Sequence, residues 1–119
     1  MGIPVLDEQA LADQMRPLGE HASEVIDLWI ANIPERVSAI STAAHAGVTQ
    51  RLAIAAHTLR GSAMYVGAAR LADRCAEIER QLHGGVPADE MDEIISQVQQ
   101  EADTAVAALL STAAIPRQG

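Results

Sequence analysis

Four histidines are the residues of this sequence best suited to chemistry at neutral pH, because an imidazole can act there as a nucleophile, a base or a metal ligand. A di-metal site in a helical protein needs Glu-x-x-His pairs, and no histidine here has a glutamate three positions before it. His21, His45 and His83 stand near predicted helix ends, where an exposed or capping histidine is the usual finding. We assign no function to these three, which leaves His57.

His57 falls in the middle of a predicted helix and is expected to face solvent. Its helix has an apolar stripe formed by Leu52, Ala56, Leu59 and Ala63. At about 100° per residue, the centre of this stripe lies roughly 150° from His57. The outward face around the histidine is small and partly apolar, and it comprises Ala53, Ile54, Arg60, Gly61 and Met64.

Gly61 follows His57 by one helical turn. A glycine within a helix costs about 1 kcal/mol relative to alanine, which this sequence uses freely. The missing side chain leaves room beside the imidazole for a tetrahedral group on a ring nitrogen, or for an approaching protein. Arg60 adds a guanidinium whose donors match phosphoryl oxygens. From these residues alone, an ordinary exposed helix histidine stays open as the alternative.

Composition and charge exclude several classes of partner. With 119 residues, the chain has the length of one domain. Its formal charge of -8 disfavours nucleic acid, and all eight basic residues are arginine. The single Cys75 cannot form an internal disulfide, in keeping with a reducing compartment. Since no apolar run approaches the ~20 residues of a membrane span and no signal peptide is recognisable, we expect a cytoplasmic location without direct membrane binding.

Apolar periodicity predicts a short helix and a long helix in the first part of the chain. The short helix spans residues 7–18, with Asp7 as its N-cap. The long helix begins near residue 21 and ends at Gly47, and it contains Pro34, which is compatible with a kink or a restart. Its predicted buried stripe comprises Val25, Leu28, Trp29, Ile33, Val37, Ile40 and Ala44.

Three further helices are predicted in the rest of the chain. One runs from a capping Thr49 to about Val66, and the next lies between Gly67 and Gly84 with an apolar stripe at Leu71, Cys75, Ile78 and Leu82. The last begins near Pro87 or Ala88 and buries Met91, Ile94, Val98, Ala102, Ala105 and Leu109. These positions make Cys75 a small core residue rather than a reactive thiol.

Helices with one narrow apolar face each can hide those faces together in a bundle. We therefore predict an all-α fold, an antiparallel up-down four-helix bundle with a short additional N-terminal helix capping one end. No repeat or linker divides the chain, so residues 1–119 are expected to form a single domain, with the bundle over roughly residues 20–112.

Residues 56–71, AHTLRGSAMYVGAARL, resemble the signature of the histidine-containing phosphotransfer (HPt) domain of bacterial multistep phosphorelays. That signature has Ala-His, then a hydrophobic residue, a Lys or Arg, a Gly and a small residue in the next turn, and later a Gly and a Leu. The chain matches it with Ala56, His57, Leu59, Arg60, Gly61, Ser62, Gly67 and Leu71. Glu79 also falls where the family often has an acidic residue. The chain departs from the family pattern at Trp29, where Phe is common, and at Val48, where an acidic residue is frequent.

This resemblance implies that His57 is the phosphoacceptor, that Arg60 neutralises phosphoryl charge and that Gly61 gives clearance. A phosphoryl group would pass from the aspartate of one receiver domain to His57 and then to the aspartate of a second receiver. The implied partners are response-regulator receiver domains and a hybrid sensor histidine kinase. The protein is expected to be a cytoplasmic monomer, or the cytoplasmic domain of a membrane-bound hybrid kinase, without autokinase activity.

No cofactor or metal site of the chain's own is expected. Because no carboxylate lies within one turn of His57 on its own helix face, the partner receiver would have to supply Mg²⁺. Docking is expected on an outward apolar patch of Ala53, Ile54 and Met64. Leu11, Met15 and Leu18 of the first helix would extend this patch if some of them remain exposed.

Three alternative functions fit parts of the sequence. The dimerisation domain of a sensor kinase is disfavoured, because that family has an acidic residue after its histidine and a proline five positions on, where this chain has Thr58 and Ser62. A helical metal-storage bundle lacks the necessary ligands. A non-catalytic helical adaptor or dimerisation module, binding a signalling partner through the His57 patch, remains the main rival.

Overall fold

The computed structural model describes residues 2–115, and this part of the chain contains helices and turns but no strand. Short 3-10 turns lie between the first two α-helices and before the last one. In chain order the elements are α1 (Glu8–Met15), η1 (Arg16–His21), α2 (Ala22–His45), α3 (Thr49–Tyr65), α4 (Ala69–His83), η2 (Ala88–Glu90) and α5 (Asp92–Ser111). No helix in the described part has the length and apolar character that crossing a membrane requires.

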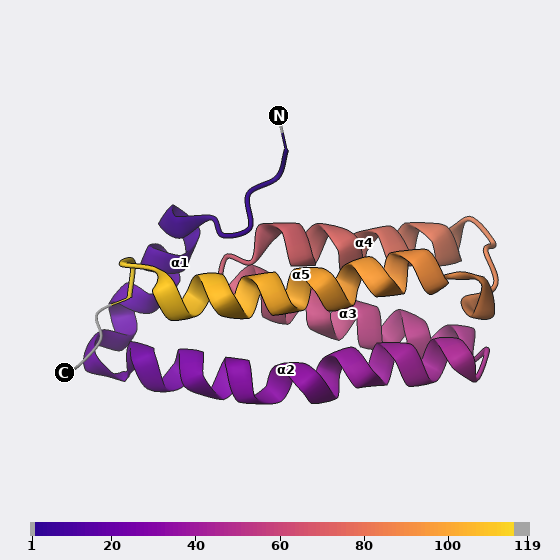
Figure 1. The fold of residues 1–119 in the computed structure, drawn as a ribbon, viewed down its shortest axis with the longest axis horizontal. Coiled ribbons are helices and arrows are strands. Elements are labelled where there is room, and N and C mark those ends of the chain that lie inside the picture. The colour runs from indigo at the N-terminus through magenta and orange to yellow at the C-terminus, as the bar shows by residue number, and fades with distance from the viewer. Residues whose placement is uncertain (1, 116–119) are drawn as a thin grey trace.

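Helices α2 to α5 form the predicted antiparallel up-down bundle (Figure 1). Each of them packs against the next one along the chain, and α5 also packs against α2, which closes the ring of four. Figure 1 places α1 across the end of the bundle where α2 begins and α5 ends. The prediction of a four-helix bundle with a short capping helix is confirmed.

The core of the bundle is aliphatic, with Trp29 as its one large aromatic member in the described residues. Every residue of the predicted α3 and α5 stripes is buried, and so are Leu71, Cys75 and Ile78 of α4. Val25, Val37 and Leu82 of the predicted stripes are partly buried, and Leu28 departs furthest from the predicted pattern, because it is 63% exposed. It lies two residues after the buried Ile26, about 200° around the helix, and therefore points away from the core.

Several helix boundaries and caps in the structure differ in detail from those predicted. Asp7 does cap α1, since its Oδ1 accepts a hydrogen bond from the backbone nitrogen of Ala10 at 3.0 Å. Thr49 does not cap α3, because it is already the first helical residue and Val48 holds the cap position without a side-chain hydrogen bond. The restart considered at Pro34 does not occur, since α2 is continuous from Ala22 to His45.

The last helix begins later than predicted. Ala88 lies in the 3-10 turn η2, and the α-helix starts at Asp92. Met91, at the cap position, is nevertheless buried as expected. The first helix is likewise shorter than predicted, because α1 ends at Met15 and the chain continues as a 3-10 turn.

The tight turn between α3 and α4 is held by the N-terminal segment. The backbone carbonyl of Gly67 accepts a hydrogen bond of 2.7 Å from the backbone nitrogen of Asp7. Arg70 reaches the same segment and donates from Nε to the carbonyl oxygen of Ile3 at 3.0 Å. Gly67 has a φ of +71°, and a Cβ built on it would lie 2.6 Å from the carbonyl oxygen of Asp7. Only glycine fits this position without moving the segment.

Gly67→Ala is expected to lower the free energy of unfolding by about 2–4 kcal/mol. The left-handed backbone alone costs a side-chain-bearing residue roughly 1–2 kcal/mol, and the new methyl group also displaces the Asp7 carbonyl. The matched control is Gly47→Ala, because Gly47 has a φ of +68° but open space around its Cβ position. Urea unfolding of both variants measures the difference, and an equal loss in both would show that the close approach of Asp7 contributes nothing.

Candidate functional site

His57 lies in the middle of α3, on the side turned away from the core. Its side chain is 69% exposed, whereas Ala56 before it and Leu59 after it are fully buried. Neighbouring residues of a helix point about 100° apart, so burial of the stripe forces the imidazole outward. The predicted direction of His57 is confirmed.

Two charged side chains meet the Nδ1 atom of His57. Glu79 of α4 places its Oε2 atom 3.2 Å from Nδ1. Arg60, one turn along α3, places its Nη2 atom 3.0 Å from the same nitrogen. Arg60 also donates from Nε to Oε1 of Glu79 at 2.6 Å. The three side chains form a closed triangle that joins α3 to α4.

The triangle constrains the hydrogen atom of the neutral imidazole. A carboxylate only accepts hydrogen bonds and a guanidinium only donates them, so Nδ1 can satisfy one of its two neighbours at a time. When Nδ1 carries the hydrogen, the ring donates it to Glu79 and the lone pair is on Nε2. In the described part of the chain Nε2 has no hydrogen-bond partner. The Glu79-bonded ring therefore presents a nucleophilic nitrogen to solvent.

The surface beside His57 is hollowed, as Gly61 predicts. A shallow depression of about 530 Å³ is lined on the α3 side by His57, Thr58, Gly61, Ser62 and Tyr65, and on the α2 side by Val25, Trp29 and Arg36. A Cβ added at Gly61 would meet no atom within 4 Å. No described part of the protein occupies the space that the glycine leaves, so the space is available to a group bound to the imidazole or to a partner.

Trp29 is one of the residues that line this depression. The indole is buried, and its Nε1 atom donates a hydrogen bond of 3.0 Å to the carbonyl oxygen of Ser62. Ser62 lies in the last turn of α3, where carbonyl groups lack helical partners. Trp29, noted above as a departure from the family's Phe, thus fixes α2 against the end of α3 through a bond that phenylalanine cannot make.

The predicted docking residues fall into two groups. Ile54 and Met64 are 60% and 57% exposed, and Ala53 is partly exposed, so this part of the apolar patch is present at the surface. Leu11 and Met15 are only 0% and 2% exposed, and their expected contribution to docking is wrong. Both face the bundle because α1 covers the end of the core, and its one apolar stripe is consumed there.

Two residues of the site were not assigned roles from the sequence. Glu79 is noted from the sequence only as an acidic position of the family. The helix face of His57 itself carries no carboxylate within one turn, but α4 supplies one from outside that helix. Arg36 of α2 lines the same depression as His57. Neither lies on the helix of His57, so a search confined to that helix could not find them. The family's acidic position at Glu79 was the one available signal.

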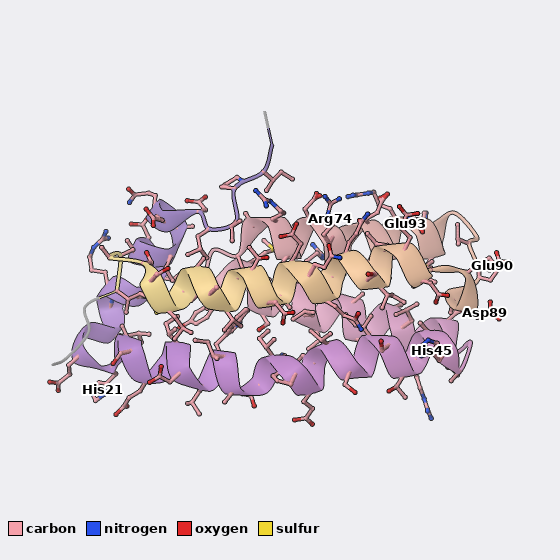
Figure 2. The ribbon with its side chains drawn as sticks, viewed as in Figure 1. His21, His45, Arg74, Asp89, Glu90 and Glu93 are labelled. Carbon is pink, nitrogen blue, oxygen red and sulfur yellow. The ribbon has the colours of Figure 1, made fainter. Side chains whose placement is uncertain are left out.

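The other three histidines stand at helix ends, as predicted. His21 ends η1, His45 ends α2 and His83 ends α4. Figure 2 shows His21 and His45 near opposite ends of the bundle, so these two cannot act together. In residues 2–115, no three side chains among His, Cys, Asp and Glu are grouped closely enough to hold a metal ion.

Cys75 lies in the α4 core and is fully buried. Burial, with a smaller contribution from the Glu79 carboxylate, raises the pKa of its thiol from 9.0 to about 12. We expect the thiol of the folded protein to react with a disulfide reagent at pH 8 at least about a hundredfold more slowly than in urea, because the thiolate is the reactive form. Equal rates with and without urea would contradict this expectation.

The same shift predicts how Cys75 affects stability at high pH. Below pH 9 the thiol is neutral in both the folded and the unfolded chain, and it causes no pH dependence. Between pH 9 and about 12 it ionises only when unfolded, so its contribution to stability is lost as the pH rises through this window. Cys75→Ala should lack this part of the decline in urea unfolding experiments.

Most of the chain is similar to known proteins. A family model described as "Hpt domain" matches residues 24–112. A search among curated proteins gives no match. Histidine-containing phosphotransfer protein B (HptB) from Pseudomonas aeruginosa PAO1 has a similar solved structure, with a TM-score of 0.79, 24% sequence identity and coverage of 92% of this chain and 94% of that chain.

A second similar structure is the HPT domain from the Hpt sensor hybrid histidine kinase from Shewanella. Its TM-score is 0.73 at 23% identity, and the alignment covers 89% of this chain and 91% of that chain. At 24% and 23% identity, the two structures support only the helical-bundle fold. Membership of the family is shown by the family model, which matches residues 24–112.

Proposed function

Because this chain belongs to the Hpt domain family and has a histidine phosphotransfer role in phosphorelays, we propose that His57 is the residue that carries the phosphoryl group. The observation that supports this most strongly is the arrangement of the ring. Nδ1 lies beside Glu79 and Arg60 and donates to Glu79 in the reactive ring form, while Nε2 is free of protein partners next to the open space at Gly61. Such a ring can act as a nucleophile without any change in the bundle.

The proposed reaction takes place on Nε2. Its lone pair attacks the phosphorus of an aspartyl phosphate on a receiver domain, the P–O bond to the aspartate breaks, and the carboxylate leaves with the electron pair of that bond. The ring becomes positively charged, and its Nδ1–H points to the Glu79 carboxylate, which stabilises that charge. Transfer to a second receiver aspartate is the reverse of this step.

Arg60 is proposed to have two roles. Its Nε atom bonds to Glu79 and keeps the carboxylate in position beside the ring. A guanidinium has five N–H donors, and those not used by Glu79 are available to neutralise the oxygens of a phosphoryl group on the neighbouring histidine. The arginine would thereby act on the product state as well as on the geometry of the free site.

Mg²⁺ is proposed to come from the receiver partner. The carboxylate closest to the imidazole, Glu79, is already bonded to Arg60 and His57, which makes it a poor ligand for an ion that prefers several oxygen ligands in octahedral geometry. The proposed partners are therefore receiver domains of response regulators and of a hybrid sensor kinase. The chain itself would act as a monomer with no cofactor of its own.

Phosphoryl transfer from a phosphorylated receiver tests this function. The purified protein is mixed with a receiver domain that carries labelled phosphate on its aspartate, with Mg²⁺ present. We expect the label to appear on His57 as an acid-labile, base-stable phosphate. A helical adaptor would bind the receiver and acquire no label, so binding without labelling of His57 across a panel of receivers would reject the proposal in favour of the adaptor.

Glu79→Ala is expected to slow transfer to His57 by about 10- to 100-fold, by analogy with the cost of removing the hydrogen-bond partner of a metal-binding histidine. Without the carboxylate, Arg60 remains as a donor to Nδ1 and favours the ring form that has its hydrogen on Nε2. Glu79→Gln should retain more activity, because an amide oxygen still accepts from Nδ1–H.

Nitrogen NMR of the His57 ring separates this positioning role from a general loss of structure. We expect the fraction of rings with hydrogen on Nδ1 to fall in Glu79→Ala and to be restored in part in Glu79→Gln. A variant that transfers slowly with an unchanged ring form would contradict the role given to Glu79.

A further inference from the structure

The depression beside His57 is lined by one arginine that does not come from α3. Arg36 of α2 is this residue, and the other lining residues are His57 and uncharged side chains, three of which carry hydroxyl groups. No carboxylate is among the lining residues, although the chain has a net charge of -8. An anion in the depression therefore meets a guanidinium and hydroxyl groups, with no carboxylate in the lining to repel it.

Arg36 has no partner within the described part of the chain. Its side chain is half-buried, and its guanidinium forms neither a hydrogen bond nor an ion pair in residues 2–115. Four other arginines have a carboxylate within 4.0 Å, and these are Arg16, Arg60, Arg70 and Arg80. Because a partly buried charge is costly unless it is paired, Arg36 is suited to a negatively charged group that is absent from the free protein.

The two ring nitrogens of His57 face different sides of the site. Nδ1 meets Glu79 of α4 and Arg60. Since the two nitrogens of an imidazole point away from each other, a phosphoryl group on Nε2 lies on the side of the ring away from Glu79. The surface beside the ring is hollowed at Gly61 and is bounded there by residues of α2. We therefore expect the phosphoryl group in the depression that Arg36 lines.

Arg60 alone does not balance the charge of such a group. By analogy with other phosphorylated side chains, the phosphoryl group carries a charge of about -2 near neutral pH. Arg60 has one positive charge, and its Nε atom is already bonded to Glu79 at 2.6 Å. Arg36 is the one other arginine among the residues that line the depression.

We propose that Arg36 binds the phosphoryl group on His57 from the α2 side, as a second phosphoryl-binding guanidinium. The proposal rests on the phosphotransfer function given above. A guanidinium presents a fork of N–H donors that matches two phosphoryl oxygens. Because this contact exists only while a phosphoryl group is on Nε2 or is arriving there, Arg36 stabilises the phosphorylated protein and the transition state of transfer relative to the free protein.

Labelling of His57 by phosphoramidate tests this contact. In that reaction the lone pair of Nε2 forms the new bond to phosphorus, the N–P bond of phosphoramidate breaks, and ammonia leaves with its electron pair. Phosphoramidate is too small to depend on a protein docking surface, so an effect on this reaction does not arise from partner binding. The variants are Arg36→Gln, Arg36→Lys and, as matched control, Arg51→Gln. Arg51 also has no partner in the described residues, but it does not line the depression.

We expect Arg36→Gln to lower both the rate of labelling and the equilibrium fraction of phosphorylated His57 by about tenfold, as for the loss of hydrogen bonds to a charged group. Arg36→Lys keeps the charge without the fork and should lie between this variant and wild type. Arg51→Gln loses the same charge elsewhere and should stay within about twofold of wild type.

Nuclear magnetic resonance separates a phosphoryl contact from an effect on the ring. The phosphorus resonance of phosphorylated His57 should shift in Arg36→Gln and stay in place in Arg51→Gln. The ring nitrogens of the unphosphorylated protein should be unchanged in Arg36→Gln, since Glu79 and Arg60 still meet Nδ1. Urea unfolding checks that each variant is folded. If Arg36→Gln is not, the comparison of Arg36→Lys with Arg51→Gln decides the matter, because lysine keeps the long aliphatic stem.

The possible failures are distinguishable. If phosphoramidate and phosphorylated receivers both leave the wild-type His57 unlabelled, the phosphotransfer function is wrong and the inference falls with it. If wild type is labelled and the folded Arg36 variants match Arg51→Gln in rate, equilibrium fraction and phosphorus resonance, the function stands and Arg36 does not bind the phosphoryl group. Slow labelling with an altered ring form and an unshifted phosphorus resonance would also overturn the contact.

Discussion

Replacing His57 by glutamine is expected to abolish phosphoryl acceptance from a receiver aspartate while the fold stays intact. The amide nitrogen of glutamine has no available lone pair for attack on phosphorus, so the chemical step is lost and not merely slowed. The side chain of His57 is 69% exposed, and a surface substitution of this kind changes stability by no more than about 0.5 kcal/mol. Circular dichroism and urea unfolding should match those of wild type while labelling is absent.

The control for this prediction is His45→Gln. His45 is an exposed histidine at the end of α2, and it has the same chemistry as His57 without its surroundings. It should accept label at the wild-type rate. Acid-labile, base-stable phosphate on the His57→Gln variant would show that another residue is the acceptor, and loss of label in both variants would point to a change in the fold.

The outward direction of His57 could be predicted because it depends on one helix alone. The positions of Leu52, Ala56 and Leu59 set the buried face of α3, and the regular rotation of a helix then fixes where every other side chain points. The same reasoning placed Ile54 and Met64 at the surface. Periodicity therefore predicted the bundle and the face of α3 that carries the site.

Glu79 shows where this kind of prediction ends. It is 22 residues from His57 in the sequence, and its contact with Nδ1 depends on the register between α3 and α4. That register is fixed by the turn at Gly67 and by the packing of the core, which are properties of the assembled bundle. Local patterns predict which faces are apolar and leave open which side chains of two faces meet.

Leu11 and Met15 show a second limit of prediction from the sequence, which is that an apolar stripe does not reveal what covers it. Their spacing showed an apolar stripe on the first helix, but a stripe has the same appearance whether it covers the core or binds a partner. The backbone hydrogen bond between Asp7 and Gly67 distinguishes these two cases, because it holds the start of α1 against the end of the bundle. The apolar face of α1 is buried there and is unavailable for docking.

The glycine at position 61 is not explained by packing between helices. Close packing between helices often requires glycine, and that explanation would remove any functional meaning from this residue. It does not apply here, because a Cβ at Gly61 would meet no atom within 4 Å. Nothing in the described bundle therefore accounts for the cost of a glycine at this helical position. The remaining explanation is a group outside the chain, either the phosphoryl group on His57 or the receiver that delivers it.

Gly61→Glu is consequently expected to slow transfer to His57 by at least about a hundredfold, since small displacements of reacting groups have effects of this size. Its side chain fills the space beside the imidazole and brings a negative charge toward the incoming phosphoryl group. Gly61→Gln separates the two causes, because it has the same bulk without the charge. Gly61→Ala should raise the stability by about 0.5–1 kcal/mol, as expected for removing a helical glycine. If Gly61→Glu transfers at the wild-type rate in a receiver assay, the space beside His57 is not used, and the glycine requires another explanation.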